Sequence, residues 1–461
     1  MTKLRKGCTG RWPVHLFQSL AMAAALSGAA ASAHAATPAE AKSRAATKTA
    51  VFPRAGQSID DFYAARSNAP LWLGAKSGDG AWQLIALLKS SWIDGLTPED
   101  YQPAQLEAKI AEATRSGKPK AMLEADRALS EAFVAYARGL SRKLVSDVYF
   151  VDEDLRPKAP TPRGLLLTAA SAKSLGQFVS GLEWMNPIYA NLRKALVERK
   201  YADERERALL AINLERARSL PGGGQRYILV NAAEQRLHTF EGGKEVDSMR
   251  VVVGKPKYQT PMMAAHVRFA ALNPYWYVPP DLAAERIAPN VQKRGLKYLN
   301  ELGYEVMSAW DDNAKVIDPL TIDWAKVTSG EVEVLIRQKP GPHNSMGRMK
   351  FMFPNSAGIY LHDNPERQLF SEASRLYSGG CVRLEDAARL GEWLFGRELE
   401  PEGAAPEERV MLPRPVPVYI TYLTAMPTSS GIAYFEDVYS RDSAKVATLT
   451  QAEKDLAAAG R

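Results

Sequence analysis

Cysteine is nearly absent from this sequence, which has only Cys8 and Cys381 among 461 residues. If an N-terminal leader that carries Cys8 is removed, one thiol remains, and a chain with one cysteine cannot form an internal disulfide. A lone cysteine is most often a buried and inert apolar residue. An unpaired thiol in an exported chain can also be reactive, so the residues around Cys381 decide its role.

Histidine is also scarce, and its spacing does not indicate a metal site. Four of the six histidines lie beyond the first 35 residues, at positions 238, 266, 343 and 362. They are scattered along the chain, so we expect neither a metal ion nor an organic cofactor. Net charge is modest as well. Without the four cations of the first 11 residues the formal +7 falls to about +3, too little to predict nucleic-acid binding.

No apolar run reaches the roughly 20 residues that a membrane-spanning helix needs. The main candidate extends from Val14 to Ala31, is rich in alanine and follows a basic stretch that begins at Lys3. Ala33-His34-Ala35 then supplies small residues at the two positions that a signal peptidase recognises. This pattern predicts a signal peptide over residues 1–35, export to the periplasm, and a mature chain without an integral membrane segment.

The rest of the chain has the composition of a globular protein, since the whole sequence is 46% apolar and 24% charged. Its length predicts two or three domains. After a flexible linker over residues 36–55, helical periodicity over 56–222 predicts a scaffold domain. Pro221 and three glycines mark the boundary to a domain over 225–424, and a C-terminal extension covers 425–461.

Apolar stripes at helical spacing predict the core of the scaffold domain. Further helices are expected to begin after Pro187 and to run from Glu204 to about Arg218. The two stripes consist of Trp82, Ile85, Leu88 and Trp92, and of Leu129, Phe133, Tyr136, Leu140 and Leu144.

Short β-rich runs separated by turn residues predict that the second domain is mostly β, so the expected fold class is α+β. Residues 281–304 have a helical pattern and interrupt the strands. The C-terminal residues 443–461 are polar and are expected to be helical. The predicted strands lie near 227–231, 237–240, 249–253, 331–336, 359–361 and 417–422, with a helix at 385–394.

The chemically informative residues are His362 and Cys381. A thiol attacks a carbonyl carbon as the thiolate, so it needs a neighbouring base or cation to lower its pKa from about 8.5. His362 ends a strand-like run 19 residues before Cys381. A strand end that faces a glycine-rich turn suits such a pair. We therefore interpret Cys381 as a nucleophile and His362 as its base, against the alternative of a structural histidine.

The residues next to Cys381 complete the candidate site. Gly379 and Gly380 let the backbone approach a substrate, and backbone amides of such a turn can point at the oxygen that becomes negative during acyl transfer. Ser378 and Arg383 are polar neighbours in the same segment. Each feature has a simpler explanation when taken alone, because a Gly-Gly pair is commonly a turn and an arginine is commonly a solvated charge.

Taken together, these residues resemble the L,D-transpeptidase catalytic domain, often called YkuD-type. In that family a histidine precedes the motif Ser/Thr-x-Gly-Cys-hydrophobic-Arg/Asn, which the segment from Ser378 to Arg383 matches after His362. The departure is Gly379, where many members carry a second histidine. The large periplasmic branch often has a small residue there, so we infer that the second histidine is dispensable.

The resemblance to the large periplasmic, YcbB-like branch extends over nearly the whole chain, from about residue 59 to residue 442. The glycine and leucine pattern of the three-helix peptidoglycan-binding module, which is common in that branch, is not found. Further matching segments are 213–216, 273–279, 337–344, 346–347, 350–351 and 353–355.

The resemblance implies a helical scaffold followed by a β-sandwich-like catalytic domain, with an insertion at about 281–330 that acts as a lid. It implies that Cys381 forms an acyl-enzyme on the tetrapeptide stem of peptidoglycan and releases D-alanine. Transfer to an amine of another stem then gives a 3→3 crosslink. His362 would take the thiol proton, held in its tautomer by a backbone carbonyl. Ser378 would support the site, and Arg383 would orient the loop or a substrate carboxylate.

Tyr360, Trp276 and His343 are expected in the walls of the substrate pocket, although core packing explains these side chains equally well. The resemblance also implies peptidoglycan stem peptides as partners and a location at the cell wall. Carbapenems acylate this class of cysteine, so we expect them to label Cys381.

Three other classes of protein are considered as alternatives. A sortase joins peptides to wall stems with the same His, Cys, Arg order, but its cysteine lies far from its arginine, whereas Cys381 and Arg383 are two residues apart. Papain-like wall hydrolases place cysteine before histidine. A non-catalytic wall scaffold or attachment protein would keep the fold without the chemistry, and the presence of both His362 and Cys381 argues against it.

Overall fold

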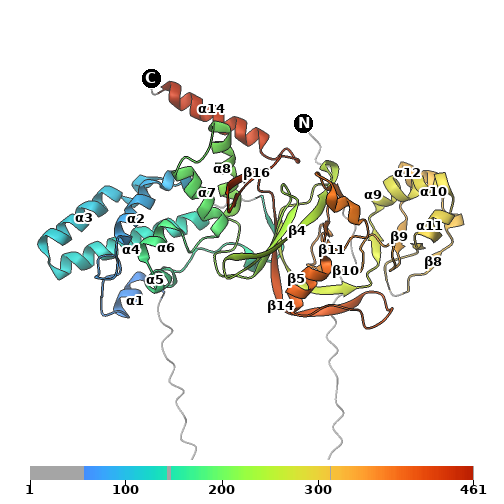
Figure 1. Cartoon of the computed structure of the whole chain (residues 1–461), viewed down its shortest axis with the longest axis horizontal. Helices are drawn as coiled ribbons and strands as arrows, with labels where there is room; N and C mark the ends of the chain where they lie inside the picture. Colours follow the sequence, from blue (N-terminus) through green and yellow to red (C-terminus); the bar gives the residue numbers. More distant parts are fainter. Residues whose placement is uncertain (1–56, 143–146, 312, 460–461) are drawn as a thin grey trace, which may run out of the picture. The chain divides into compact units, whose positions relative to one another are not determined.

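The computed structural model describes residues 57–142, 147–311 and 313–459. The expected signal peptide, the linker and Leu144 of the second apolar stripe lie outside these residues. Within them, a helical region comes first and a mostly β region follows it (Figure 1). The predicted α+β fold class is therefore confirmed.

Several scaffold helices, such as α7 and α8, begin after residues whose side chains satisfy free amides of the first turn. Asn186 Oδ1 accepts from Ile188 N at 2.9 Å, and Asp203 Oδ1 accepts from Glu206 N at 2.8 Å. The helices are α1 (Ile59–Ala64), α2 (Gly80–Lys89), α3 (Pro103–Ser116), α4 (Pro119–Arg142), α5 (Pro162–Ser171), α6 (Leu175–Ser180), α7 (Pro187–Val197) and α8 (Glu204–Ala217), with 3-10 turns η2 (Ser91–Asp94), η3 (Pro98–Tyr101) and η4 (Glu153–Leu155).

Two fully buried carboxylates tie the loops of the scaffold to its helices. Asp126 on α4 accepts hydrogen bonds from the three backbone amides of residues 71–73, at 2.7–2.8 Å. Asp94 accepts from the hydroxyl of Tyr136 at 2.8 Å and from Arg193 Nε at 2.9 Å. A charge buried in this way is tolerated because several donors replace its lost hydration.

The two tryptophans of the first apolar stripe do not belong to the core. Trp82 is 53% and Trp92 63% exposed, whereas Ile85 and Leu88 are buried. Repeated steps of three residues drift around a helix with 3.6 residues per turn, so the outer members of the stripe leave the buried face. In addition, α2 ends at Lys89, and Trp92 lies on the separate turn η2. The prediction was wrong for both tryptophans.

The second, mostly β region is built on one ten-stranded sheet that closes on itself. The order is β1-β5-β10-β11-β13-β4-β3-β2-β14, β14 also pairs with β5, and β12 adds to β4. The expected antiparallel series β2, β3, β4 is confirmed. The strands are β1 (Tyr149–Phe150), β2 (Tyr227–Asn231), β3 (Arg236–Glu241), β4 (Lys244–Gly254), β5 (Met263–Leu272), β10 (Met349–Met352), β11 (Leu361–His362), β12 (Leu376–Ser378), β13 (Val382–Leu384) and β14 (Glu408–Thr421).

Between β5 and β10 the chain forms an inserted unit with its own apolar core. Its sheet has the order β6-β9-β7-β8 and is covered by the expected helices (Figure 1). Because β6 and β9 pair with each other, the unit begins before and ends after the expected 281–330. Its elements are β6 (Trp276–Val278), α9 (Pro280–Leu282), the π-helical turn η6 (Ala283–Ile287), α10 (Ala288–Arg294), α11 (Lys297–Glu301), β7 (Tyr304–Met307), β8 (Val316–Ile317), η7 (Pro319–Thr321), α12 (Trp324–Ser329) and β9 (Leu335–Gln338).

The strand predicted at 331–336 begins later, at Leu335. The amides of Glu331 and Val332 donate to the carbonyl of Lys326, at 2.9 and 3.2 Å, and so belong to the end of α12. A similar shift affects α13 (Ala387–Phe395), which begins two residues after the predicted start. There Asp386 Oδ1 caps the helix through Arg389 N at 3.0 Å.

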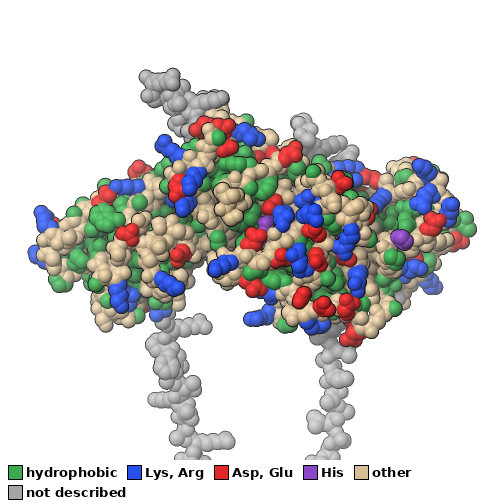
Figure 2. All heavy atoms as spheres, in the orientation of Figure 1, with side chains coloured by type: hydrophobic (Ala, Val, Ile, Leu, Met, Phe, Trp, Pro, Cys, Tyr) green, Lys and Arg blue, Asp and Glu red, His purple; other side chains and the backbone are tan. Residues whose placement is uncertain are grey.

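The predicted C-terminal helix is present as α14 (Ser443–Ala459). It packs against α8 (Figure 1), and a hairpin of β15 (Ala425–Thr428) and β16 (Gly431–Tyr434) precedes it. No described helix is both long and apolar enough to cross a membrane. Basic and acidic side chains are interspersed on the face shown in Figure 2.

His238 on β3 is a buried histidine outside the candidate site, and its surroundings predict a pH effect on stability. Burial disfavours its charged form, but hydrogen bonds to Glu234 at 2.9 Å and Glu245 at 3.0 Å outweigh this and raise its pKa to about 9. A raised pKa stabilises the fold below the ordinary value of 6.5, and this contribution is lost as pH rises toward 9.

We therefore expect the free energy of unfolding to fall by about 3 kcal/mol from this group between pH 6.5 and 9. Urea denaturation across this range measures the effect. The variant His238→Gln should lack this loss, so an identical pH dependence in the variant and the wild type would contradict the assignment.

Candidate active site

Cys381 lies in the short turn between β12 and β13, two strands that both pair with β4. It is a free cysteine and is partly exposed, and Sγ donates to Gly358 O at 3.5 Å. Burial raises the pKa of the thiol to about 11, although hydrogen bonds with Tyr360 and the positive charges of Arg383 and Lys350 favour the thiolate. Cys381 is therefore a neutral thiol at neutral pH, and it would have to lose its proton to act as a nucleophile.

A serine hydroxyl closes the turn that carries Cys381. Ser378 Oγ donates to Cys381 O at 2.6 Å and accepts from Gly380 N at 3.0 Å. Gly380 has a φ of +121°, which residues with a side chain rarely adopt. Among the described residues, the amide of Cys381 has no acceptor. This amide is thus free to bind a substrate oxygen.

The backbone conformation of this turn leads to a prediction. We expect Gly380→Ala to lower the free energy of unfolding by about 1–3 kcal/mol, because the new Cβ opposes the positive φ. This Cβ would also lie 3.3 Å from Ile359 Cδ1. We further expect acylation of Cys381 to slow by about tenfold or more, since a small misplacement of a catalytic group is costly. Thermal denaturation and the acylation rate measure the two effects.

Gly379→Ala is the matched control for this prediction. Gly379 lies outside the positive-φ region, and its Cβ would press only on Leu282 Cδ1, at 3.1 Å. The control should therefore lose much less activity. Equal losses in the two variants would show that the positive φ of Gly380 is unimportant.

His362 is placed by strand pairing. It ends β11, and the parallel register of β11 with β13 sets it beside Arg383. The side chain is buried, and its Nδ1 lies 2.6 Å from Asp363 O. Because a carbonyl oxygen only accepts, Nδ1 carries the proton and Nε2 keeps its lone pair. The expected tautomer, held by a backbone carbonyl, matches this geometry.

The surroundings of His362 keep the imidazole neutral. Burial and the positive charges of Arg383 and Lys350 lower its pKa to about 3. Hydrogen bonds with the backbone at Asp363 and Met346 have the opposite effect and raise the pKa, but they do not outweigh the lowering. The ring is therefore uncharged at neutral pH and is able to accept a proton.

Tyr360 contacts both members of the candidate pair. Among the described residues no hydrogen bond joins His362 to Cys381. The Tyr360 ring lies 5.8 Å from the His362 ring, between centroids, and Tyr360 hydrogen-bonds with Cys381. Tyr360 also packs against the cores of both the main sheet and the inserted unit. Direct proton transfer thus requires the thiol to turn from Gly358 O toward Nε2.

Arg383 is buried and turned toward the segment that follows His362. Its Nη1 donates to Glu366 Oε2 at 2.8 Å and to Asn364 Oδ1 at 3.4 Å. Of the two roles considered for Arg383, these contacts favour orientation of the loop over contact with a substrate carboxylate.

The inserted unit touches the turn that carries Cys381. Leu282 of α9 packs against Gly379. Glu285 accepts from Tyr258 Oη at 2.7 Å and forms an ion pair with Lys257, both on the loop after β4. A Cβ at position 379 would lie 3.1 Å from Leu282 Cδ1, so any side chain there makes a tight contact with the inserted unit.

The other two candidates for pocket walls do not contact Cys381 in the described part of the chain. Trp276 is 5% exposed and belongs to the core of the inserted unit. His343 is exposed, and its carbonyl accepts from Gln338 Nε2 at 2.8 Å. The alternative of core packing fits Trp276.

Two buried polar residues near the site were not singled out from the sequence as site residues. Lys350 on β10 forms an ion pair with Glu407 at 2.8 Å. A lysine within an otherwise apolar strand was the sequence feature that could have indicated it. Thr260 Oγ1 donates to Gly380 O at 2.8 Å. No local sequence pattern predicts this contact of Thr260, because its partner Gly380 lies 120 residues further along the chain.

Asp152, Asp154 and His266 form the group of described residues that has metal-ligand chemistry. Arg268 already pairs with Asp152 at 2.6 Å, and Asp152 Oδ2 also accepts from His266 N at 2.7 Å. These contacts satisfy the carboxylate without an ion, and the group is not in contact with Cys381.

Comparison with known proteins gives two matching families. Residues 57–196 match the scaffold domain, and residues 225–409 match the L,D-transpeptidase catalytic domain (YkuD). A Haemophilus influenzae protein named "Putative L,D-transpeptidase" is 30% identical over 240 residues, which are 50% of this chain and 48% of that protein. The chain thus spans about half the length of this curated relative.

Two solved structures are similar over part of the chain. An L,D-transpeptidase from Mycobacterium smegmatis has a TM-score of 0.20 and 12% identity, covering 44% of this chain and 61% of that one. The avibactam carbamoyl enzyme of Ldtfm has a TM-score of 0.20 and 13% identity, covering 44% and 51%. These TM-scores are too low to indicate a shared fold.

Proposed function

Because this chain carries a scaffold domain and, over residues 225–409, an L,D-transpeptidase catalytic domain of the YkuD type, we propose that it is a peptidoglycan transpeptidase with Cys381 as its nucleophile. The observation that carries the proposal is the turn of Ser378, Gly380 and Cys381, which presents a partly exposed thiol and a free amide beside the strand that ends in neutral His362. A nucleophile, a base and an oxyanion donor are thus supplied by adjacent strands.

In acylation, Sγ bonds to the carbonyl carbon between the third and fourth residues of a tetrapeptide stem while its proton passes to His362 Nε2. The electron pair of the carbonyl moves to its oxygen, which accepts from the Cys381 amide. When the tetrahedral intermediate collapses, the C–N bond breaks and the proton on His362 passes to the departing amine of D-alanine. The product is a thioester on Cys381.

Deacylation is the same sequence with a different amine. A side-chain amine of a second stem attacks the thioester carbon, and His362 takes a proton from this amine. The C–S bond breaks, the proton returns to Sγ, and a 3→3 crosslink is formed. Tyr360 contacts Cys381 and the inserted unit, so we place it at the wall of the stem-binding pocket. Arg383 holds the loop that carries Asp363, whose carbonyl fixes the His362 tautomer.

The reaction can be tested by mass spectrometry of products. The purified protein is incubated with disaccharide fragments that carry tetrapeptide stems, beside the Cys381→Ala variant. We expect loss of D-alanine and formation of dimers by the wild type alone, and labelling of the wild-type cysteine by a carbapenem. Cleavage without dimers would make the enzyme a carboxypeptidase. Absence of both cleavage and labelling would favour a non-catalytic wall scaffold.

We also propose that the protein works at the cell wall after export. This follows from the peptidoglycan substrate and from the signal peptide predicted over residues 1–35, a segment outside the described residues. Fractionation of cells that express the full-length chain, with and without residues 1–35, tests the location. Retention of the intact chain in the cytoplasm would oppose it.

A further inference from the structure

The Gly380 carbonyl and the Cys381 amide belong to one planar peptide unit, so a contact that fixes the first also aims the second. Thr260 Oγ1 donates to Gly380 O at 2.8 Å and accepts from Gly254 N at 2.9 Å. Thr260 is fully buried. In a trans peptide the C=O and N–H point in opposite directions, so this bond directs the Cys381 N–H away from Thr260. That N–H is the one with no acceptor among the described residues.

Two residues of the C-terminal extension hold Thr260 in its place. Tyr439 Oη donates to Gly254 O at 2.5 Å and accepts from Thr260 N at 3.4 Å. Arg441 Nη2 donates to Thr260 O at 3.1 Å and to Gln259 Oε1 at 3.0 Å. Every backbone polar group of Thr260 therefore faces a side chain from the far end of the sequence.

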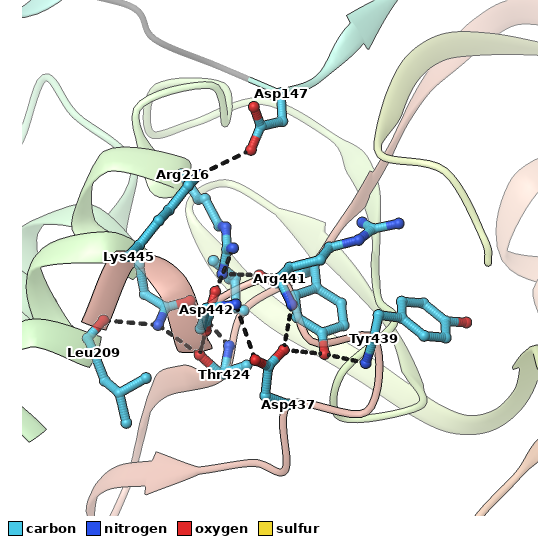
Figure 3. Close-up of polar contacts among 12 residues, drawn as sticks. Asp147, Leu209, Arg216, Thr424, Asp437, Tyr439, Arg441, Asp442 and Lys445 are labelled. Carbon is cyan, nitrogen blue, oxygen red and sulfur yellow. Dashed lines mark hydrogen bonds and ion pairs between the residues drawn. The ribbon is translucent and has the colours of Figure 1, made fainter. Parts of the chain in front are cut away.

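The C-terminal extension is itself anchored to the sheet and the scaffold (Figure 3). Asp442 is buried and bonds with Arg216 of α8 and with Thr424, which follows β14. Asp437 accepts from the amides of Arg441 at 2.8 Å and Asp442 at 2.9 Å, and so fixes the backbone between them. A continuous set of polar contacts thus leads from a scaffold helix to the peptide unit of the nucleophile.

We propose that Thr260 is a positioning residue that aims the Cys381 amide at the reacting carbonyl oxygen, and that Tyr439 and Arg441 keep Thr260 in position. The C-terminal extension is therefore part of the support of the active site. This inference rests on the proposed function, because the carbonyl oxygen gains negative charge only if Sγ attacks the carbonyl carbon. The other amide that could bind the carbonyl oxygen, Gly380 N, already donates to Ser378 Oγ. Stabilisation of the oxyanion therefore depends mainly on the direction of the Cys381 amide.

The experiment compares Thr260→Val with Thr260→Ser in the full chain. Valine has the shape of threonine but no hydroxyl, whereas serine keeps the hydroxyl. We expect Thr260→Val to lower kcat for D-alanine release by about 10- to 100-fold, somewhat less than removal of an oxyanion donor. KM should change by less than about threefold, and Thr260→Ser should recover at least half of the activity. Alkylation of the thiol by iodoacetamide needs no oxyanion donor, so its rate should stay near that of the wild type.

A readout independent of activity separates this inference from the proposed function. With ¹⁵N-cysteine the chain gives signals only from Cys8 and Cys381, and Cys381→Ser identifies the second. Thr260→Val should shift the Cys381 amide signal, and Thr260→Ser should not. If the wild type released no D-alanine, the proposed function would fail while this signal still tested the positioning. An unmoved signal, an unchanged kcat, or equal losses of kcat and alkylation rate would each overturn the inference.

The variant Tyr439→Phe tests the same inference from the C-terminal extension, and it remains informative if Thr260→Val does not fold. Loss of the hydroxyl removes the bonds to Gly254 O and Thr260 N. We expect a smaller fall in kcat, about 3- to 10-fold, together with a shift of the Cys381 amide signal. The control Tyr434→Phe alters a tyrosine of the nearby hairpin and should change neither quantity.

Discussion

Replacement of Cys381 by alanine is expected to abolish stem-peptide transfer while the fold is retained. Loss of the nucleophile in an enzyme that acts through a covalent intermediate lowers kcat by about 10⁴-fold or more. The structural cost should be small, because Cys381 is a partly exposed residue whose Sγ bonds, among the described residues, only with Gly358 O, at 3.5 Å, and with Tyr360. Mass spectrometry of the intact protein after exposure to stem fragments or a carbapenem should show an adduct on the wild type and none on the variant.

Cys381→Ser is the control for shape in this experiment. It keeps the hydrogen-bonding geometry but replaces the thiol by a hydroxyl, which is a much poorer nucleophile without a strong base. Near-complete inactivity with an unchanged melting temperature is expected. Release of D-alanine by Cys381→Ala at the wild-type rate would assign the chemistry to another residue.

His362→Ala is expected to slow acylation by about 10²- to 10⁴-fold, the usual contribution of a general base. The reason lies in the two pKa values. The thiol of Cys381 has a pKa of about 11 and His362 one of about 3, so both groups are neutral in the resting protein at pH 7. Such a pair is unlike the preformed thiolate and imidazolium pair of some cysteine enzymes. His362 therefore has to remove the proton during the attack.

The low pKa of His362 predicts how the acylation rate depends on pH. His362 should remain neutral down to about pH 4, because its pKa is about 3, so its protonation should not limit the rate between pH 5 and 8. The wild-type acylation rate in single-turnover reactions should be nearly flat over this range. His362→Ala should instead show a rate that rises about tenfold per pH unit, since only the thiolate then reacts. A wild-type rate that fell below pH 6.5 would contradict the low pKa.

The same low pKa makes His362 a source of acid sensitivity in the fold. The folded-state value of about 3 lies below the ordinary 6.5, so the unfolded chain binds more protons between these limits. The free energy of unfolding should therefore decrease as pH falls through this window, by about 1.4 kcal/mol per pH unit from this group. Chemical denaturation between pH 4 and 7 measures the effect, and His362→Gln should flatten it.

Strand pairing brings together the segments that carry Cys381 and His362, two residues 19 positions apart in the sequence. The motif around Cys381 and the strand that ends at His362 were both readable in the sequence, because glycine and β-branched or aromatic runs have strong local preferences. Their adjacency follows from the parallel register of β11 with β13, which no local pattern specifies. The resemblance to a known family supplied that relation in advance.

Some predictions from helical periodicity were wrong, because tertiary packing decided the outcome. Trp82 and Trp92 share a helical spacing with buried residues, yet both are exposed. Trp82 lies on a face of α2 that does not meet the rest of the scaffold, and Trp92 lies on the separate turn η2, where the spacing of α2 no longer applies. The inserted unit extends beyond its helical segment, because β6 and β9 pair across 57 intervening residues. Pairing at such separation is decided by tertiary contacts that propensity does not encode.

The sequence by itself determined the fold class and the switch from helices to strands near Pro221, and it predicted that one thiol and one histidine act together, since these depend on local periodicity, turn chemistry and a compact motif. Only the tertiary structure decided the protonation of that pair and the support of the turn. Burial keeps both groups neutral, and the nearby positive charges of Arg383 and Lys350 add to this effect at His362 while opposing it at Cys381. Thr260, Tyr439 and Arg441 reach the turn from distant segments. Desolvation and long-range hydrogen bonds depend on how the whole chain packs, so no local stretch of sequence specifies them.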